Sequence, residues 1–529
     1  MSFLFYNLRL GKNFWESYIE IKDLYKKFFY EIKNDFLLLI IFLFTFLTFS
    51  FLFIFTLICH PHGTDVYTYH IPVAARIIIE KGFPSTEFLN LNPHQFYFPK
   101  NMEILYAFYY TFLGTDRGIL TLHFPFLFFG ILASYLILRK LNVSRNKALY
   151  VFSFLQMPII PALSQTLKPD LEVSFIFLIF LSLLLIDFPY NLFFSLITLS
   201  FGCGIKYSLL IVFFIFFTFC CFKFIKHNRY WLILGSILLC ILTSFHFYIF
   251  NFILKKNPLF PFEIKFFNIS IFKGKEEILK SYFNLPVYTF NPFIILSHLF
   301  EFAPDVNYFY TYDNLGGGFG HYFISLGFIS FFILFFIILK NKDKKILMLL
   351  LFTFLFFFTS PFRWWPRFHI YLCCISIIFS IYIWERLKDL NFNFFITFIT
   401  IISFFESHHD TITAFSPFFR LFDYKENAFN LLHTPSEILK TYSLISLNLR
   451  KEDKIAVWDK DWPAPPYPNL YRTFIGIILA KEWKIRYDAV YDFENLKFYE
   501  KIIAPSFLEF QDYEKLYSDE NLSFWVKKR

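Results

Sequence analysis

The chain contains apolar runs long enough to cross a membrane. The first, Phe36–Cys59, has 24 consecutive residues without a charged side chain, and a spanning helix needs only about 20 apolar residues. In lipid such a run must form a helix, because a helix satisfies its own backbone hydrogen bonds. Hydrophobic residues make up 57% of the chain and charged residues 17%, against about 25% charged in soluble domains. The sequence therefore predicts an all-α polytopic membrane bundle.

The apolar runs predict three regions. Residues 1–35 form a cytoplasmic amphipathic lead-in, residues 36–405 form the transmembrane domain, and residues 406–529 form a small extracytoplasmic α/β domain. Outer loops are expected at 60–117 and 251–318. Within the first loop, the short apolar stretch 101–113 is expected along the interface or partway into the membrane. We predict about eleven spans, at 36–59, 118–138, 148–167, 171–186, 191–205, 207–222, 231–250, 319–339, 346–361, 368–384 and 391–405.

The basic residues gather in alternate loops. Positive charge retains short loops in the cytoplasm, so this pattern places the N-terminus inside and, with an odd number of spans, the C-terminal domain outside. The net charge of +9 is explained by these loops and does not indicate a nucleic-acid partner. The predicted inner loops carry Arg139, Lys140, Arg145, Lys147, Lys223, Lys226, Arg229, Lys340, Lys342, Lys344, Lys345, Arg386 and Lys388.

The composition changes after residue 405. The segments DKIAVW, TFIGIIL, IRYDAVY and EKIIAPS have the pattern of short strands. No phosphate-binding glycine loop or zinc-protease motif occurs there, so we assign this region no catalysis. The seven cysteines lie in or beside apolar runs and are interpreted as small hydrophobic residues.

Charged and polar residues concentrate on the predicted outer side. A charge near the bilayer centre costs about 2.5–3.5 kcal/mol on insertion scales, so such residues usually face a cavity or a partner. Lys and Arg are suited to a lipid phosphate, and a carboxylate is suited to accepting a proton from a hydroxyl. The residues are Asp65, His70, Arg76, Glu103, Asp116, Arg117, Lys168, Asp170, Glu172, Lys206, Arg363 and Arg367.

The order of several motifs resembles that in the bacterial GT-C-type membrane glycosyltransferases. These proteins are similar to glycosyltransferase family 39 and are related to protein O-mannosyltransferases and lipid A aminoarabinose transferases. The resemblance covers roughly residues 36–370. It implies inverting transfer from a polyprenyl-phosphate sugar, with Asp65 as the general base. The motifs are TDVYTYHIPVA, HQFYFPKNMEILYAFYYTFLGTD, SQTLKPDLEVSFIFL, GCGIKYSLL, NFILKKNPLFPFE, GGGFGHYF and WWPRF.

We expect the remaining candidates to bind substrate, with Lys206 and Arg367 toward the donor phosphate and Asp170 and Asp116 on the acceptor side. His70, Glu103 and Lys168 complete the expected set. Each has a simpler interpretation. Asp65 could cap a helix, as could Asp170 together with Glu172. Lys206 and Arg367 could extend to lipid headgroups, Glu103 could only orient the first loop, and His70 could be a packing partner.

No cofactor is expected, and a divalent metal at His60, His62 and Asp65 is the less favoured alternative. The expected partners are the bilayer, the lipid-linked sugar and an acceptor glycan, lipid or protein. The expected location is the inner membrane. Two rival functions remain open: a flippase or other transporter of lipid-linked saccharides, and a non-catalytic protein that binds them.

Overall fold

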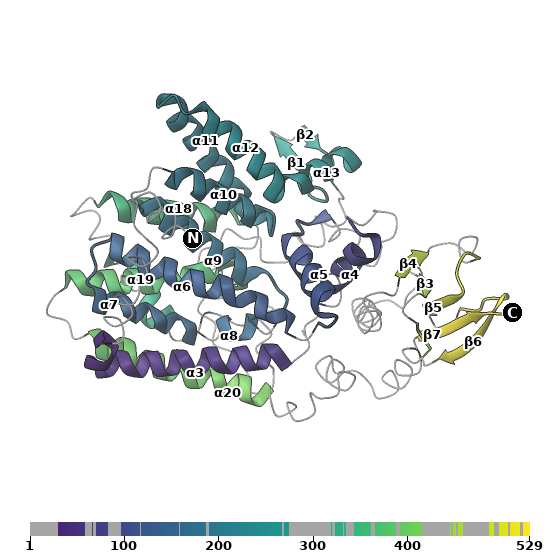
Figure 1. Cartoon of the computed structure of the whole chain (residues 1–529), viewed down its shortest axis with the longest axis horizontal. Coiled ribbons are helices and arrows are strands. Elements are labelled where there is room, and N and C mark those ends of the chain that lie inside the picture. The colour runs from purple at the N-terminus through teal and green to yellow at the C-terminus, as the bar shows by residue number, and fades with distance from the viewer. Residues whose placement is uncertain are drawn as a thin grey trace, which may run out of the picture.

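The structure is a computed structural model, and most of the chain forms one helical bundle (Figure 1). A sheet of five strands lies to one side of it. The residues described are 30–58, 66, 70–82, 97–116, 118–157, 159–164, 166–186, 190–266, 269–274, 319, 323–328, 330–331, 333–334, 343–360, 366–387, 392–414, 445, 448–450, 453–458, 486–490, 497–505, 508–518 and 522–528.

Among the residues that the structure describes, helices cover most of the predicted spans, and the bundle is that of a multi-pass membrane protein. Within the described residues, five helical stretches are long and apolar enough to cross a membrane: Phe36–Ile54, Ile119–Lys140, Tyr207–Lys226, Tyr230–Lys255 and Arg367–Arg386. The α-helices are α3 (Phe36–Ile58), α4 (Ile71–Glu80), α5 (Asn101–Leu113), α6 (His123–Lys140), α7 (Arg145–Leu149), α8 (Ile159–Leu163), α9 (Asp170–Leu185), α10 (Asn191–Cys203), α11 (Leu210–Lys226), α12 (Tyr230–Cys240), α13 (His246–Lys255), α18 (Lys344–Thr359), α19 (Ile370–Arg386) and α20 (Phe392–Ala414).

Short helical segments of other types join these helices. They are the 3-10 helices η4 (Ile119–Leu122), η5 (Tyr150–Gln156), η6 (Tyr207–Leu209) and η9 (Pro366–His369), and the π-helices η7 (Ile241–Phe245) and η8 (Phe323–Phe328).

One predicted span is broken. Residues 148–167 were expected to form a single helix, but the chain passes through α7, η5 and α8 instead. Met157 ends η5 in an extended conformation, with φ −68° and ψ 125°. It precedes Pro158, and proline disfavours the helical conformation in the residue before it.

Helix α19 forms the centre of the bundle, and α3 lies at its edge. The span Arg367–Arg386 is 89% buried and Phe36–Ile54 only 28%. Around α19 the core is aromatic, since the Tyr371 ring lies 4.4 Å from that of Phe356 and 5.1 Å from that of Phe177. On α3, α11 and α12 large apolar side chains are exposed, as expected for helices that face lipid.

The bundle has two distinct ends. Chain segments that were predicted to be cytoplasmic meet at the end that holds α7, since Lys345 Nζ donates to the Lys140 carbonyl (3.0 Å) and Ser144 Oγ donates to Glu385 Oε2 (2.9 Å). We call this the α7 end. The opposite end holds α4 and α5 (Figure 1), and we call it the α4 end.

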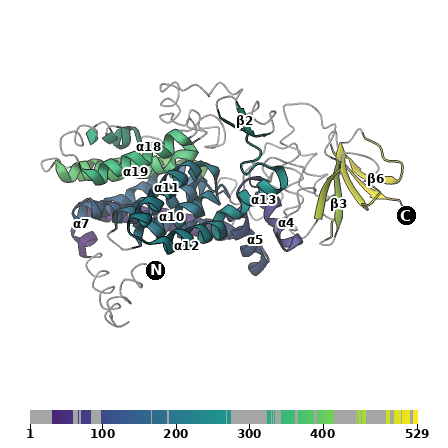
Figure 2. The same cartoon turned by 90° about the horizontal axis from the view of Figure 1, so that it is seen from above.

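Two sheets complete the fold. Strands β1 (Ile264–Phe266) and β2 (Ile269–Phe272) form an antiparallel pair after α13. The C-terminal strands have the order β4-β3-β5-β7-β6, with β3 parallel to β4 and β5 and the other neighbours antiparallel. Figure 2 shows this sheet beyond α4 and α5. Its strands are β3 (Lys454–Trp458), β4 (Arg486–Val490), β5 (Lys501–Pro505), β6 (Tyr513–Ser518) and β7 (Leu522–Lys527).

Three of the four predicted C-terminal strands are confirmed as β3, β4 and β5, and the fourth, TFIGIIL, lies outside the described residues. Strands β6 and β7 were not predicted. Trp525 of β7 packs its ring 5.2 Å from Phe510, which gives this sheet an apolar core of its own.

The packing of α6 on α9 generates a prediction. Gly130 of α6 faces Phe175 of α9 so closely that an added Cβ would lie 2.4 Å from the ring. We expect Gly130→Ala to lower the free energy of unfolding by about 1–3 kcal/mol, the usual cost of overpacking a core. Gly235→Ala is the matched control, because its Cβ would meet Phe193 at 3.7 Å. Unfolding midpoints of the purified variants in detergent test this, and equal midpoints would contradict it.

Candidate functional site

Three chain segments that are distant in sequence meet at the α4 end. The Tyr207 hydroxyl donates to the carbonyls of Tyr97 (2.7 Å) and Phe260 (3.1 Å), and Asn251 Nδ2 also donates to Tyr97 (2.8 Å). The first outer loop is further fixed to the α10–η6 turn, because the Asn101 amide donates to the Gly204 carbonyl at 2.9 Å. These bonds make a polar layer at the end of an apolar bundle.

Lys206 and Asp170 form an ion pair in this layer. Asp170 is the first residue of α9, where the positive end of the helix dipole favours a carboxylate. Lys206 lies in the extended turn between α10 and η6, and its ammonium donates to Asp170 Oδ1. The Asp170 side chain is 2% exposed and that of Lys206 is 20% exposed. The aspartate is thus enclosed, while the lysine still reaches the surface of the site.

The ring of Phe368 joins a second cation to this pair. Lys206 Nζ lies 3.9 Å from the ring centroid, and the Arg367 guanidinium carbon lies 5.0 Å from it. Cations are attracted to aromatic faces at such distances. The structure therefore brings together Lys206, Asp170 and Arg367, all of which the sequence had marked. Phe368 was not predicted, although its place beside Arg367 in WWPRF was a usable signal.

His70 and Glu103 form another buried pair. His70 precedes α4, Glu103 lies in the first turn of α5, and His70 Nδ1 is 2.6 Å from Glu103 Oε1. Tyr106 packs edge-on against His70, with ring centroids 6.3 Å apart, and donates to the Leu167 carbonyl at 3.0 Å. This contact connects the first outer loop to the turn that carries Lys168 and Asp170.

Lys168 and Asp116 are also buried, at 4% and 6% exposure. Lys168 lies two residues before Asp170, and its amide donates to Thr166 Oγ1 at 3.3 Å. Asp116 lies in the turn between α5 and η4, and its carbonyl accepts a hydrogen bond from the Ile119 amide at 3.1 Å.

His123 and Glu172 form a pair that the sequence did not predict. Glu172 was one of the outer-side charged residues, with capping of the fourth span as its simpler interpretation. Its carboxylate contacts His123 of α6, and both side chains are at most 2% exposed. His123 Nε2 lies 2.7 Å from the Thr166 carbonyl. The histidine thus bridges α9 and the turn before it, which fixes the position of Asp170.

Several sequence candidates lie outside the described residues. These are Asp65, Arg117, Arg363 and the histidines of the alternative metal site, His60 and His62. Within the part of the chain that the structure describes, no three His, Cys, Asp or Glu side chains are grouped closely enough to hold a metal ion. The general base and the metal alternative therefore stay predictions.

The Lys206–Asp170 pair predicts strong coupling between its members. Lys206→Met leaves a buried carboxylate without its cation, and we expect a loss of about 2 kcal/mol or more. Asp170→Asn in the same chain removes that charge, so the double variant should be more stable than the sum of the single changes implies. Unfolding of all four proteins in detergent measures this coupling, and purely additive effects would contradict the pair.

Lys100 predicts a pH dependence. Burial lowers the pKa of its ammonium from 10.5 to about 8, although Glu103 opposes the shift. The unfolded chain therefore binds more protons than the folded chain between these values, and stability rises with pH across that window. We expect Lys100→Met to raise stability on the order of 3 kcal/mol more below pH 8 than above pH 10.5. A constant difference between variant and parent across this range would contradict the shift.

Comparison with known proteins agrees with the fold. No protein-family model matches the sequence, and no curated protein matches it. The crystal structure of ArnT from Cupriavidus metallidurans bound to undecaprenyl phosphate is similar, with a TM-score of 0.52 and 10% identity over 92% of this chain and 97% of that one. The apo structure of the same protein has a TM-score of 0.51, 10% identity and the same coverage. The predicted resemblance is confirmed for the fold: this chain has the architecture of ArnT.

Proposed function

We propose that the chain is a membrane glycosyltransferase that moves a sugar from a polyprenyl-phosphate donor to an acceptor on the outer face of the inner membrane. The observation that carries the proposal is the meeting of Lys206, Arg367 and Asp170 at one end of a bundle with this fold. The likeness to ArnT, solved with undecaprenyl phosphate, supports a lipid-phosphate donor.

Lys206 and Arg367 face the donor phosphate in this proposal. Asp170 and the Phe368 ring hold the lysine ammonium in place before the substrate arrives. Negative charge grows on the phosphate as the bond to the sugar breaks, so a fixed cation stabilises the transition state more than the ground state. Arginine adds a planar pair of donors that matches phosphate oxygens.

The first outer loop supplies the base. The acceptor hydroxyl attacks the anomeric carbon, Asp65 accepts the hydroxyl proton, and the polyprenyl phosphate leaves with the electrons of the broken bond. Attack opposite to the leaving group inverts the anomeric centre. We propose no cofactor for this transfer, because Lys206 and Arg367 supply positive charge at the leaving phosphate.

The other candidates position these groups. Glu103 and His70 lock α4 against α5 and so orient the first loop, and Lys168 adds positive charge beside Asp170. Asp170 and Asp116 shape the acceptor side. In the membrane, we propose about eleven spans. We also propose a cytoplasmic N-terminus and an extracytoplasmic C-terminal domain, because the basic loops gather at the α7 end.

Asp65→Asn is the direct test of this function. We expect sugar transfer from a labelled polyprenyl-phosphate donor to fall by about 100-fold or more, since a general base contributes roughly 10²–10⁴-fold. Donor binding should be retained, because the cations are intact. Glu509→Gln makes the same charge change at an exposed residue of the C-terminal region and should leave transfer unchanged.

Other outcomes separate the rival functions. Full transfer by the Asp65→Asn variant would remove the assigned base. Movement of labelled lipid across a vesicle membrane by the parent protein, without transfer, would indicate a flippase. Binding alone would indicate a non-catalytic protein.

A further inference from the structure

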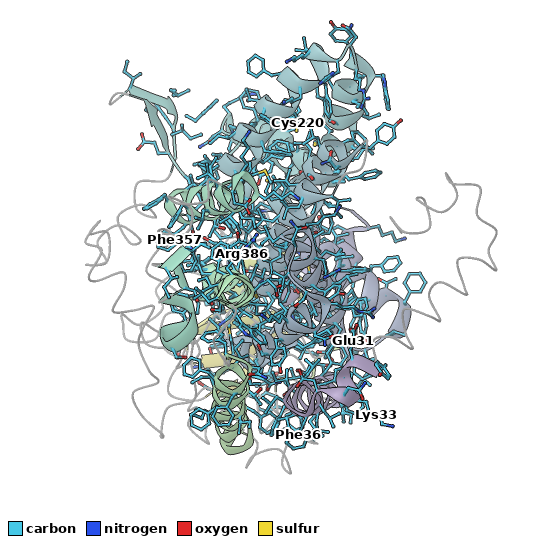
Figure 3. The ribbon with its side chains drawn as sticks, turned by 90° about the vertical axis from the view of Figure 1, so that its left-hand side faces the viewer. Glu31, Lys33, Phe36, Cys220, Phe357 and Arg386 are labelled. Carbon is cyan, nitrogen blue, oxygen red and sulfur yellow. The ribbon has the colours of Figure 1, made fainter. Side chains whose placement is uncertain are left out.

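A cavity of about 450 Å³ lies at the α7 end of the bundle. Its wall includes Asp35, Arg145, Asn146, Lys147, Tyr150 and Trp384. Figure 3 shows this end, with Glu31 and Phe36 on one side and Arg386 nearer the middle of the view. The volume lies within the range of pockets that hold small ligands, and the proposed glycosyltransferase site lies at the other end.

The cavity lies at the expected level of lipid headgroups. Asp35 directly precedes the candidate span Phe36–Ile54, and Trp384 lies in the last turn of the span Arg367–Arg386. Tyr and Trp side chains are enriched at this boundary between hydrocarbon and water. Tyr150 and Trp384 pack edge-to-face here, with ring centroids 5.2 Å apart. A ligand in the cavity would therefore lie at the level of the phospholipid headgroups.

One part of the wall holds two cations, each paired with a carboxylate. Arg145 Nε is 2.8 Å from Glu31 Oε2, and Lys147 Nζ is 3.6 Å from Glu385 Oε2 and donates to the Trp384 carbonyl at 3.2 Å. These contacts fix both side chains, which nevertheless remain 23% and 24% exposed. Guanidinium and ammonium groups are the usual ligands of phosphate oxygens in proteins.

Another part of the wall is anionic and aromatic. The Asp35 carboxylate accepts hydrogen bonds from the Tyr150 hydroxyl (3.1 Å) and from the amides of Leu37 and Leu38 (3.1 Å each). These donors hold the negative charge in place at the start of α3. The indole face of Trp384 is already occupied by Lys147 Nζ, 4.7 Å from the ring centroid, so the Asp35 carboxylate is the group that attracts a ligand cation. This side of the cavity suits a ligand ammonium.

We propose that the cavity binds the headgroup of a zwitterionic phospholipid of the phosphoethanolamine class. Its phosphate lies against Arg145 and Lys147, and its ammonium lies toward Asp35. An anionic lipid with a polyol headgroup would satisfy only the cationic part of the wall. The site is separate from the proposed glycosyltransferase site and does not depend on that function.

Native mass spectrometry of the full-length protein tests the proposal with two lipids, phosphatidylethanolamine and phosphatidylglycerol. We expect the parent protein to retain phosphatidylethanolamine about tenfold more strongly, since one charge-assisted contact changes affinity on that order. Lys147→Gln should weaken this retention by about the same factor. Lys226→Gln removes an exposed charge at the same end, outside the cavity, and should change nothing.

Asn146→Trp provides a second variant that keeps every ion pair. Asn146 is an exposed residue of the wall, and an indole there would fill the cavity. Loss of retention with an unchanged unfolding midpoint would support the site even if Lys147→Gln failed to fold. Equal retention of the two lipids would overturn the ligand class. Retention that is absent from the parent, or unaffected by both cavity variants, would overturn the site.

Discussion

A buried carboxylate in a membrane bundle needs a cation close by, and this constraint organises the α4 end. The Asp170 side chain is 2% exposed, and Lys206 reaches it from the turn after α10. Removing either partner would leave a charge in surroundings that stabilise charge poorly. The turn before α9 and the turn after α10 therefore cannot move apart freely, and the Phe368 ring of η9 contacts the Lys206 ammonium as well. Helices that pack mainly through apolar contacts thus become fixed at one end by charge.

The same need for polar partners distinguishes the two ends. At the α4 end the His70–Glu103 and Lys206–Asp170 pairs are largely buried. Each pair joins two segments that are distant in sequence. At the α7 end the ion pairs are more exposed, as with Arg145 and Glu31 at 23% and 20%. Exposed pairs contribute little to stability, so that end is better suited to holding a ligand at the surface. The proposed reaction centre and the proposed lipid contact thus lie at opposite ends of the bundle.

The sequence predicted the bundle well because an apolar run of about 20 residues has only one stable form in lipid. It marked Asp170, Lys206 and Arg367, but it could not pair them, because pairing depends on which helices become neighbours. The break in the helix at Met157 was not predicted, because a hydropathy pattern indicates how long an apolar run is but not its backbone conformation. His123 was not predicted, because a single histidine at the start of a helix can have many roles. Its role becomes clear only from its contact with Glu172 in the structure. Phe368 was hidden among 86 phenylalanines.

The central claim is that Lys206 and Arg367 receive the phosphate of a polyprenyl lipid. A structure of the purified chain with undecaprenyl phosphate tests it most directly. The account predicts the phosphate within hydrogen-bonding distance of both cations, with the Asp65 carboxylate facing the same pocket. A phosphate bound elsewhere, or an Asp65 side chain directed into the lipid tails, would contradict it.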